Sequence, residues 1–119
     1  MFNATGDEIY KKAATHMRNQ IDRTGRTPEG GFYHRYPGYI DQMWLDGIYM
    51  LDVFYARWTY EFEPDNTTAW DDIALQFDII NKVTTSSNHT NGLPVHGFDA
   101  GKTQVWADPV TGAAPHVWG

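Results

Sequence analysis

The chain has no cysteine among its 119 residues, which excludes both a disulfide framework and a zinc site built from thiolates. The histidines lack the spacing of metal ligands as well, because no His-x-x-x-His pair or similar pattern occurs around His34, His96 or His116. We therefore expect no metal ion and no other cofactor.

Basic residues are also scarce, since nine Lys and Arg stand against fifteen Asp and Glu, for a net charge of −6. Nucleic-acid binding needs clustered basic side chains that neutralise phosphates, and no basic run occurs here. No apolar stretch reaches the roughly 18 residues that span a bilayer, and residues 1–7 lack the features of a signal peptide. We expect no nucleic-acid or membrane partner. Composition leaves the oligomeric state and the compartment, secreted or cytoplasmic, open.

Aromatic residues are abundant by contrast, with five Trp, seven Tyr and six Phe making 15% of the chain. Aromatic faces fill a hydrophobic core, and they also stack on the apolar faces of sugar rings. Most of these rings are expected in the core, and a minority is available for a sugar-binding cleft.

Three segments have the apolar spacing of helices: 7–22, 41–62 and 68–85. The middle segment is apolar on nearly all of its faces, and such a helix is covered on several sides in a folded protein. A short extended piece is predicted at 32–35, and 92–119 reads as irregular because Gly and Pro recur in it. The sequence thus predicts an all-α protein whose middle helix needs more neighbours than these segments supply.

A weak repeat supports the same conclusion. Gly31-Phe32-Tyr33-His34 and Gly92-Leu93-Pro94-Val95-His96 each follow a helix and a polar turn. Helical hairpins that repeat in this way bury their apolar faces by stacking on neighbouring hairpins. We therefore expect residues 1–119 to be a fragment of one larger helical domain.

Four stretches together carry a family resemblance, and it extends from about Tyr10 onward. They are Gly30-Gly31-Phe32-Tyr33-His34, Gln42 to Met50, Gly92 to Asp99 with its His-Gly-Phe-Asp, and Trp106-Ala107-Asp108-Pro109 through Trp118-Gly119. In order and spacing this set resembles glycoside hydrolase family 105, the unsaturated rhamnogalacturonyl hydrolases. The resemblance implies an (α/α)6 barrel of about twelve helices, of which this chain supplies roughly the first third to 40%.

The resemblance also implies a reaction. These enzymes act on oligosaccharides from pectin lyases, whose non-reducing end is a 4,5-unsaturated galacturonyl residue. The double bond is protonated at C4 and hydrated at C5, and the glycosidic bond is lost as the ring rearranges. One carboxyl group gives the proton and then takes one from water, provided that its pKa lies near the working pH.

Two aspartates match the catalytic positions of the family. Asp99, in His-Gly-x-Asp, matches the catalytic acid/base, and the alternative for it is an aspartate that caps the turn at Ala100-Gly101. Asp46, in Met-Trp-Leu-Asp-Gly, is expected in the first two turns of the 41–62 helix, where the helix dipole favours a charged carboxylate. It then orients water or a sugar hydroxyl, and the alternative is a hydrogen bond to a neighbouring loop with no chemical role.

The resemblance further implies six side chains that bind the unsaturated uronyl oligosaccharide: Met43, Trp44, His34, His96, Trp106 and Trp118. Met43 and Trp44 would line the pocket floor, although a core position is the competing interpretation for Met43. Trp106 and Trp118 would stack on sugar rings. His96 would bind the uronate carboxylate or tune the nearby catalytic carboxyl, and His34 is alternatively a hydrogen-bonded loop residue.

Three other interpretations compete with this one. Family 88, the unsaturated glucuronyl hydrolases, is similar in fold and chemistry and acts on glycosaminoglycan fragments. A truncated, non-catalytic sugar-binding fragment is the second. A helical interaction module is the third, and it gives no reason for the pairing of Asp46 with Asp99.

Overall fold

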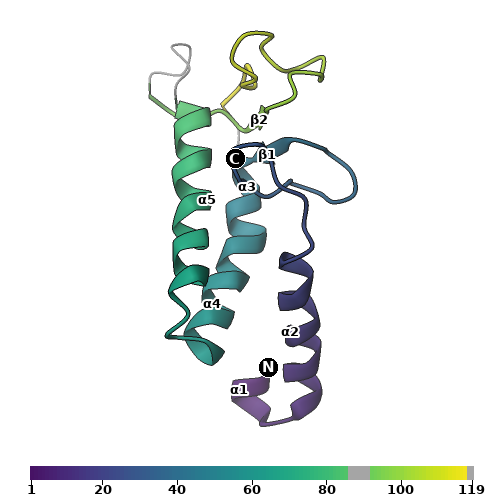
Figure 1. Cartoon of the computed structure of the whole chain (residues 1–119), viewed down its shortest axis with the longest axis vertical. Helices are drawn as coiled ribbons and strands as arrows, with labels where there is room; N and C mark the ends of the chain where they lie inside the picture. Colours follow the sequence, from purple (N-terminus) through teal and green to yellow (C-terminus); the bar gives the residue numbers. More distant parts are fainter. Residues whose placement is uncertain (86–91, 118–119) are drawn as a thin grey trace.

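The computed structural model describes residues 1–85 and 92–117 and shows an elongated group of helices with a small ribbon of strand at one end (Figure 1). It measures 49 × 28 × 23 Å along its principal axes. In chain order the elements are α1 (Phe2–Thr5), α2 (Glu8–Ile21), β1 (Gln42–Trp44), α3 (Leu45–Gly47), the π-helical η1 (Ile48–Asp52), α4 (Val53–Phe62), α5 (Thr67–Thr85) and β2 (Gly97–Asp99). The predicted helical class is confirmed, with one short ribbon added to it.

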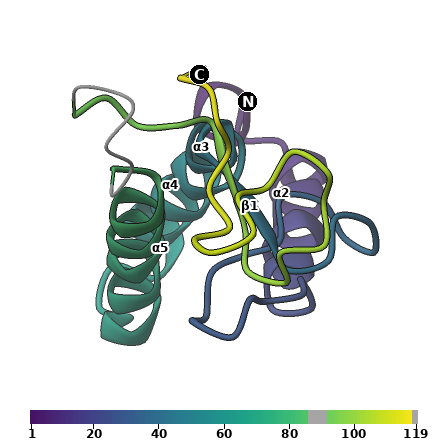
Figure 2. The same cartoon turned by 90° about the horizontal axis from the view of Figure 1, so that it is seen from above.

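The long helices lie side by side along the long axis, with α4 between α2 and α5 (Figure 1). The loops that connect them to β1 and β2 gather at one end. Seen from above, β1 and the segment that follows β2 cross over the space between α5 and α2 (Figure 2). Segments far apart in the sequence therefore meet at this end.

Helices α2 and α5 agree with the predicted segments 7–22 and 68–85 because both carry local start signals. The carboxylate of Asp7 accepts a hydrogen bond from the backbone N–H of Ile9 at 3.0 Å and caps α2. Asn66 does the same for α5, since its Oδ1 accepts from the backbone N–H of Ala69 at 3.1 Å. None of the helices within 1–85 and 92–117 combines the length and hydropathy that a bilayer span requires.

The predicted start of the middle helix at residue 41 is wrong. Gln42–Trp44 forms strand β1, which pairs antiparallel with β2 so that Met43 lies opposite Phe98. The helix begins at Leu45 and passes through the π-helical turn η1 before α4. A three-residue strand is too short to show a period of two, and its partner lies in the stretch read as irregular. The pairing is therefore a long-range effect that local spacing does not reveal.

The core has two main clusters that follow the helix contacts. One cluster holds α2, α4 and α5 together through Ile21, Phe32, Tyr55, Ala69 and Ile73. The other joins the ribbon to α5, and it consists of Met43, Ile79 and Ile80. Burial of such side chains supplies most of the favourable free energy of folding.

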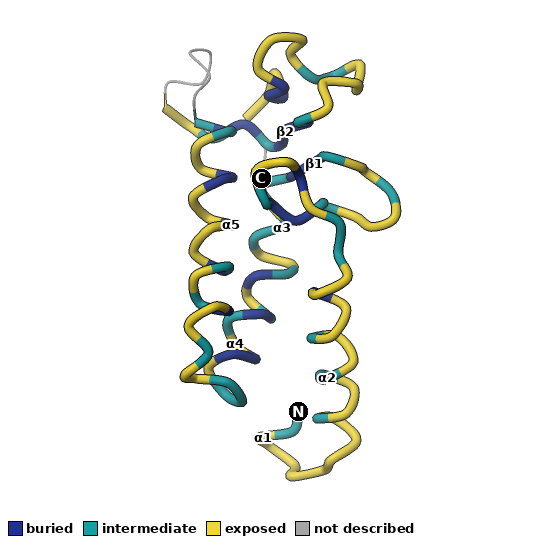
Figure 3. The backbone as a smooth tube through the Cα atoms, in the orientation of Figure 1, coloured by how far each residue is buried: buried dark blue, intermediate teal, exposed yellow. Residues whose placement is uncertain are grey.

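Figure 3 shows that the outer faces of α2 and α5 are exposed, and large apolar residues are among the exposed ones. On the middle helical segment, Tyr49 is 78% exposed and Tyr60 is 65% exposed. On α2, Ile9 and Met17 face solvent, although their spacing from the buried Ile21 in multiples of four residues predicts a shared helix face. The middle helix is thus only partly covered, as its composition leads one to expect.

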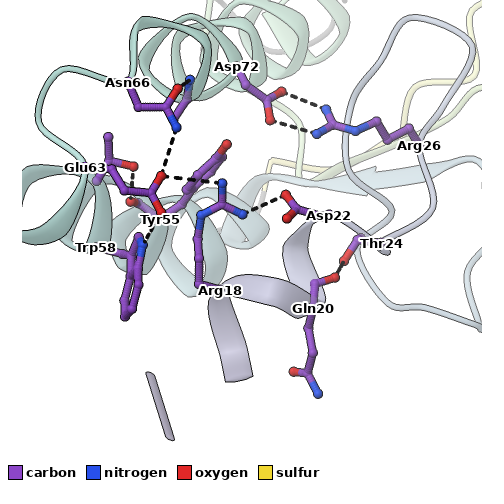
Figure 4. A network of polar contacts seen from close by, with 12 residues as sticks. Arg18, Gln20, Asp22, Thr24, Arg26, Tyr55, Trp58, Glu63, Asn66 and Asp72 are labelled. Atoms are coloured by element: carbon purple, nitrogen blue, oxygen red, sulfur yellow. Dashed lines mark hydrogen bonds and ion pairs between the residues drawn. The ribbon is translucent and has the colours of Figure 1, made fainter. Parts of the chain in front are cut away.

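A network of polar contacts ties the helices together below the ribbon (Figure 4). Arg26 binds Asp72 of α5 through two hydrogen bonds of 2.7 Å each, the fork geometry that guanidinium and carboxylate groups favour. Arg18 of α2 lies 3.9 Å from Glu63, which also accepts a 2.9 Å hydrogen bond from the indole of Trp58. These contacts fix α2, the end of α4 and α5 relative to one another.

Candidate active site

The ribbon brings the two predicted catalytic motifs together, because β1 contains Met-Trp and β2 contains Gly-Phe-Asp. Side chains alternate between the two faces of a strand, and residues directly opposite each other share a face. The register pairs Gln42 with Asp99 and Trp44 with Gly97. Asp99 therefore lies on the same face of the ribbon as Trp44, while Met43 points to the other face.

Met43 lies in the core. Its side chain is only 4% exposed and packs against Ile79 and Ile80 of α5. It also lines the inner wall of a small cavity behind Trp44. Met43 therefore has the burial and the contacts expected of a core residue.

Trp44 stands at the centre of an aromatic group, which we call the ring cluster: His34, Tyr39, Trp44, His96 and Trp106. The imidazole of His34 stacks on Trp44 with ring centroids 4.4 Å apart and planes at 11°. Tyr39 stacks on Trp44 at 5.3 Å, and the ring of His96 lies 5.6 Å from that of Trp44 with the two planes at 84°. The indole N–H of Trp44 donates to the side-chain oxygen of Gln42 at 3.2 Å and so fixes the ring.

Four of the predicted binding residues thus come together, namely His34, Trp44, His96 and Trp106. The ring of Trp106 lies 5.9 Å from that of His96. Trp106 also packs against a separate small apolar cluster made of Val95, Ala113 and Ala114. Trp118 lies outside the described residues.

Tyr39 is a member that the sequence prediction missed. Its φ of 50° is uncommon for a residue other than glycine, and such backbone needs support from its surroundings. The neighbouring Asp41 supplies support, because its carboxylate accepts from the Tyr33 hydroxyl at 2.9 Å and its carbonyl accepts from the Ala100 N–H at 2.8 Å. Nothing in local sequence spacing places Tyr39 against Trp44.

Asp46 occupies the first turn of the helical segment that starts at Leu45, as predicted. Its side chain is 53% exposed, and its Oδ1 lies 4.0 Å from Nδ1 of His34. The N–H of Leu45 donates to the carbonyl of His96 at 2.7 Å and holds the helix start against the approach to β2. Asp46 therefore presents an accessible carboxylate at the edge of the ring cluster.

Asp99 has a different setting, since it is fully buried and its carboxylate organises the turn that follows β2. Its Oδ2 accepts from the N–H groups of Thr103 at 2.8 Å and Gln104 at 2.9 Å and from the Thr103 hydroxyl at 3.3 Å. Among residues 1–85 and 92–117, its Oδ1 accepts from the N–H of Gly101 alone, at 3.0 Å. These contacts are the ones expected of an aspartate that caps a turn, and they leave Oδ1 as the less engaged oxygen.

No hydrogen bond or ion pair joins the two carboxylates within the described ranges. Asp99 lies opposite Gln42 on the ribbon, whereas Asp46 lies beyond the other end of β1. The structure thus holds a buried carboxylate on the ribbon and an accessible one on the helix that follows β1.

His34 is the titratable group closest to Asp46. Burial lowers the pKa of His34 below its usual range, and the nearby charge of Asp46 only partly offsets this. At neutral pH the imidazole is therefore neutral, and it can donate one hydrogen bond and accept another. In this setting it acts through hydrogen bonds more than through charge.

Asp52 is a second residue that the sequence prediction missed. It ends the π-helical turn η1, is only 2% exposed, and lines the cavity behind Trp44. Burial raises the pKa of Asp52 to about 7, the charge of Asp72 adds to this, and Arg26 opposes it. A lone carboxylate in the apolar run Met50-Leu51-Asp52-Val53-Phe54 was a visible signal, of the same kind that draws attention to Asp46.

No group of three or more His, Asp or Glu side chains lies within reach of one metal ion in the part of the chain that the structure describes.

The helices, with their connecting loops gathered at one end, match a fragment of the six-hairpin glycosidase fold. A solved structure of a family 105 glycoside hydrolase from C. acetobutylicum ATCC 824 is similar to this chain, with a TM-score of 0.89 and 42% sequence identity. The similarity covers 98% of this chain and 31% of that one. The predicted partial barrel is confirmed as a fragment of that fold.

The family itself follows from the sequence. A sequence model of Glycosyl Hydrolase Family 88 matches residues 1–119. The chain belongs to this family. The sequence model of the family includes family 105.

Proposed function

We propose that this chain is part of a hydrolase that removes the 4,5-unsaturated galacturonyl residue from unsaturated rhamnogalacturonan oligosaccharides. The observation that carries the proposal is the accessible carboxylate of Asp46 beside the ring cluster, at the end of the helices where the family motifs meet. The 42% identity to a family 105 glycoside hydrolase supports it. Because the chain spans 31% of that relative, the activity is proposed for a protein in which further helices complete the barrel.

The ring cluster suits the sugar. The ring centroids of His34 and Tyr39 are 5.9 Å apart, whereas two rings stacked on opposite faces of the indole would be at least roughly 7 Å apart, twice the contact distance of about 3.5 Å, so both rings lie on the same side. In the proposal, the unsaturated ring stacks on the opposite side of Trp44, where aromatic and apolar sugar faces match. In the same proposal the imidazole of His96, whose ring lies 5.6 Å from that of Trp44, binds the uronate carboxylate.

The proposed reaction needs one proton at C4 and one water at C5 of the vinyl ether. Asp99 gives the proton to C4, and the water oxygen bonds to C5 while its own proton returns to a carboxylate. The hemiketal at C5 then opens to a ketone, the freed hydroxyl at C1 forms an aldehyde, and the glycosidic oxygen leaves as an alcohol. Asp46 orients water or a sugar hydroxyl through its accessible carboxylate.

The geometry sets a condition on this division of roles. Asp99 can carry the proton on Oδ1, which accepts a single hydrogen bond, but the residue is buried under the 100–104 turn. The proposal therefore requires that this turn moves aside when substrate binds. Asp46 needs no such movement because it is already exposed.

The test is loss of the ultraviolet absorbance of the double bond in an unsaturated rhamnogalacturonan disaccharide. Asp99→Asn and Asp46→Asn each remove one ionisable oxygen at nearly constant shape, and Asp78→Asn on the exposed face of α5 is the matched control. We expect each site substitution to lower kcat by at least about 100-fold, which is the lower range for loss of a general acid or base. Full activity in Asp99→Asn would reject its proposed role.

A glucuronyl substrate is the second candidate, because the Family 88 sequence model that matches the chain includes family 105 and so fits either substrate. Turnover of the unsaturated chondroitin disaccharide in the same assay separates the two. Preference for chondroitin would move the proposal from pectin fragments to glycosaminoglycan fragments and leave the hydration chemistry unchanged.

A further inference from the structure

Asp52 is a buried acid with an unusual position. It lies at the end of the π-helical turn η1, and such turns recur at functional sites because they redirect one side chain. Its Oδ1 is buried and has no hydrogen-bond partner among the described residues. Buried polar atoms are nearly always satisfied by protein or by water, so this oxygen requires an explanation.

His34 contributes a second atom of the same kind. Its Nδ1 is buried and lacks a hydrogen-bond partner in the described part of the chain, since the Asp46 oxygen at 4.0 Å is beyond hydrogen-bond range. His34 and Asp52 line the same cavity, whose volume is about 50 Å³. Two unsatisfied polar side chains therefore share one small space.

The rest of the cavity wall offers little to either of them. Phe32 and Met43 are apolar, and the amide of Gln76 is already used. Its oxygen accepts from the Phe32 N–H at 2.8 Å, and its nitrogen donates to the carbonyl of Gly30 and to Asp72. Tyr33 also lines the cavity, and its hydroxyl donates to Asp41. The cavity exceeds the roughly 10–15 Å³ that one water needs, and its two unsatisfied atoms supply the polar partners.

We propose that ordered water in this cavity connects the carboxyl of Asp52 to Nδ1 of His34, so that Asp52 is a positioning residue for the imidazole beside Asp46. The water would satisfy both atoms with one bridge. Asp52 touches no reacting atom in this arrangement, and it acts by setting which nitrogen of His34 carries the proton.

The charges around the pair set its pH behaviour. Asp72 of α5 and Arg26 of the loop before β1 act on Asp52 in opposite directions, and Asp46 acts on His34. Below about pH 7 Asp52 is protonated and donates into the water bridge, and above it the carboxylate only accepts. The hydrogen bond at Nδ1 of His34 therefore reverses near neutral pH, above the pH at which His34 itself takes a proton.

Nuclear magnetic resonance of the protein carrying 15N-histidine and 13C-aspartate tests the inference without substrate or turnover. We expect the His34 ring nitrogens to show two steps, their own protonation below pH 6.5 and a second step near pH 7 that coincides with the Asp52 carboxyl titration. Asp52→Asn removes the second step and keeps the first, whereas Asp78→Asn keeps both. A single His34 step that Asp52→Asn leaves unchanged would overturn the proposal.

The unsubstituted protein gives an independent readout in case Asp52→Asn does not fold. Nuclear Overhauser contacts between a bound water and the His34 ring are expected. Their absence in a protein whose His34 resonances are assigned would contradict a water bridge. Because neither readout involves catalysis, failure here and failure of the proposed hydrolase activity are distinguishable.

Discussion

At the scale of single residues, burial separates three aspartates that look alike in the sequence. Asp46 is exposed beside His34, Asp52 is buried with one oxygen that has no partner among the described residues, and Asp99 is buried and bonded mainly through Oδ2 to the turn after β2. The sequence identified Asp46 and Asp99 through their motifs. It missed Asp52, which belongs to no motif and is recognised by its burial and its missing partner.

Stability should depend on pH through Asp52. Its pKa rises from 3.8 to about 7 on folding, so the folded protein holds this proton more tightly than the unfolded chain. The resulting stability is fully present below about pH 4 and is lost as pH rises through about 7, by up to about 4 kcal/mol. The free energy of unfolding, measured with urea at each pH, should change less with pH for Asp52→Asn than for the unsubstituted protein. An equal change in both proteins would contradict a raised pKa at Asp52.

Met43 can be tested against its competing role. It is 4% exposed in a cluster with Ile79 and Ile80, so Met43→Ala should cost about 2–5 kcal/mol of unfolding free energy. Met50 is the matched control, because it is 55% exposed and Met50→Ala should change stability by no more than about 0.5 kcal/mol. Equal and small losses in both would favour a substrate-facing role for Met43.

At the scale of elements, the ribbon is the feature that assembles the site. Helices α2 and α5 were predictable because their spacing and their caps at Asp7 and Asn66 are local. Strand β1 was not, because Met43 and Trp44 fit a helical stripe equally well until β2 pairs with them. The same long-range pairing places Asp99 on the face of Trp44. The π-helical turn η1 has no counterpart in the apolar spacing either.

Glycine at position 112 should be required for this ribbon. Gly112 has a φ of 81°, and a Cβ there would fall against the backbone carbonyl of Asp99. Gly92 has a similar φ of 85°, but a Cβ on it would meet no described atom within 4 Å. Gly92→Ala should therefore cost only the backbone strain of about 1 kcal/mol, and Gly112→Ala should cost clearly more. Equal losses, measured by chemical unfolding, would show that the 112 contact does not constrain β2.

At the scale of the whole molecule, the exposed apolar surface and the family match point the same way. Tyr49, Val53 and Tyr60 on the middle helical segment are each more than half exposed. The chain aligns with 98% of its own length but with 31% of the solved relative. The apolar composition of residues 41–62 predicted that this segment lacks cover. The positions of Tyr39 and of the 100–104 turn, by contrast, could be learned only from the structure.

Hydration of a double bond is the proposed reaction, and the carbon that receives the incoming hydrogen distinguishes it from direct hydrolysis. The unsaturated rhamnogalacturonan disaccharide would be cleaved in D2O by the protein with its barrel complete, and the released uronate followed by proton and deuterium magnetic resonance. Hydration predicts one deuterium at C4, loss of the vinyl signal and a ketone at C5. Release of a uronate whose C4=C5 double bond is intact would contradict the account and indicate direct attack at the anomeric carbon.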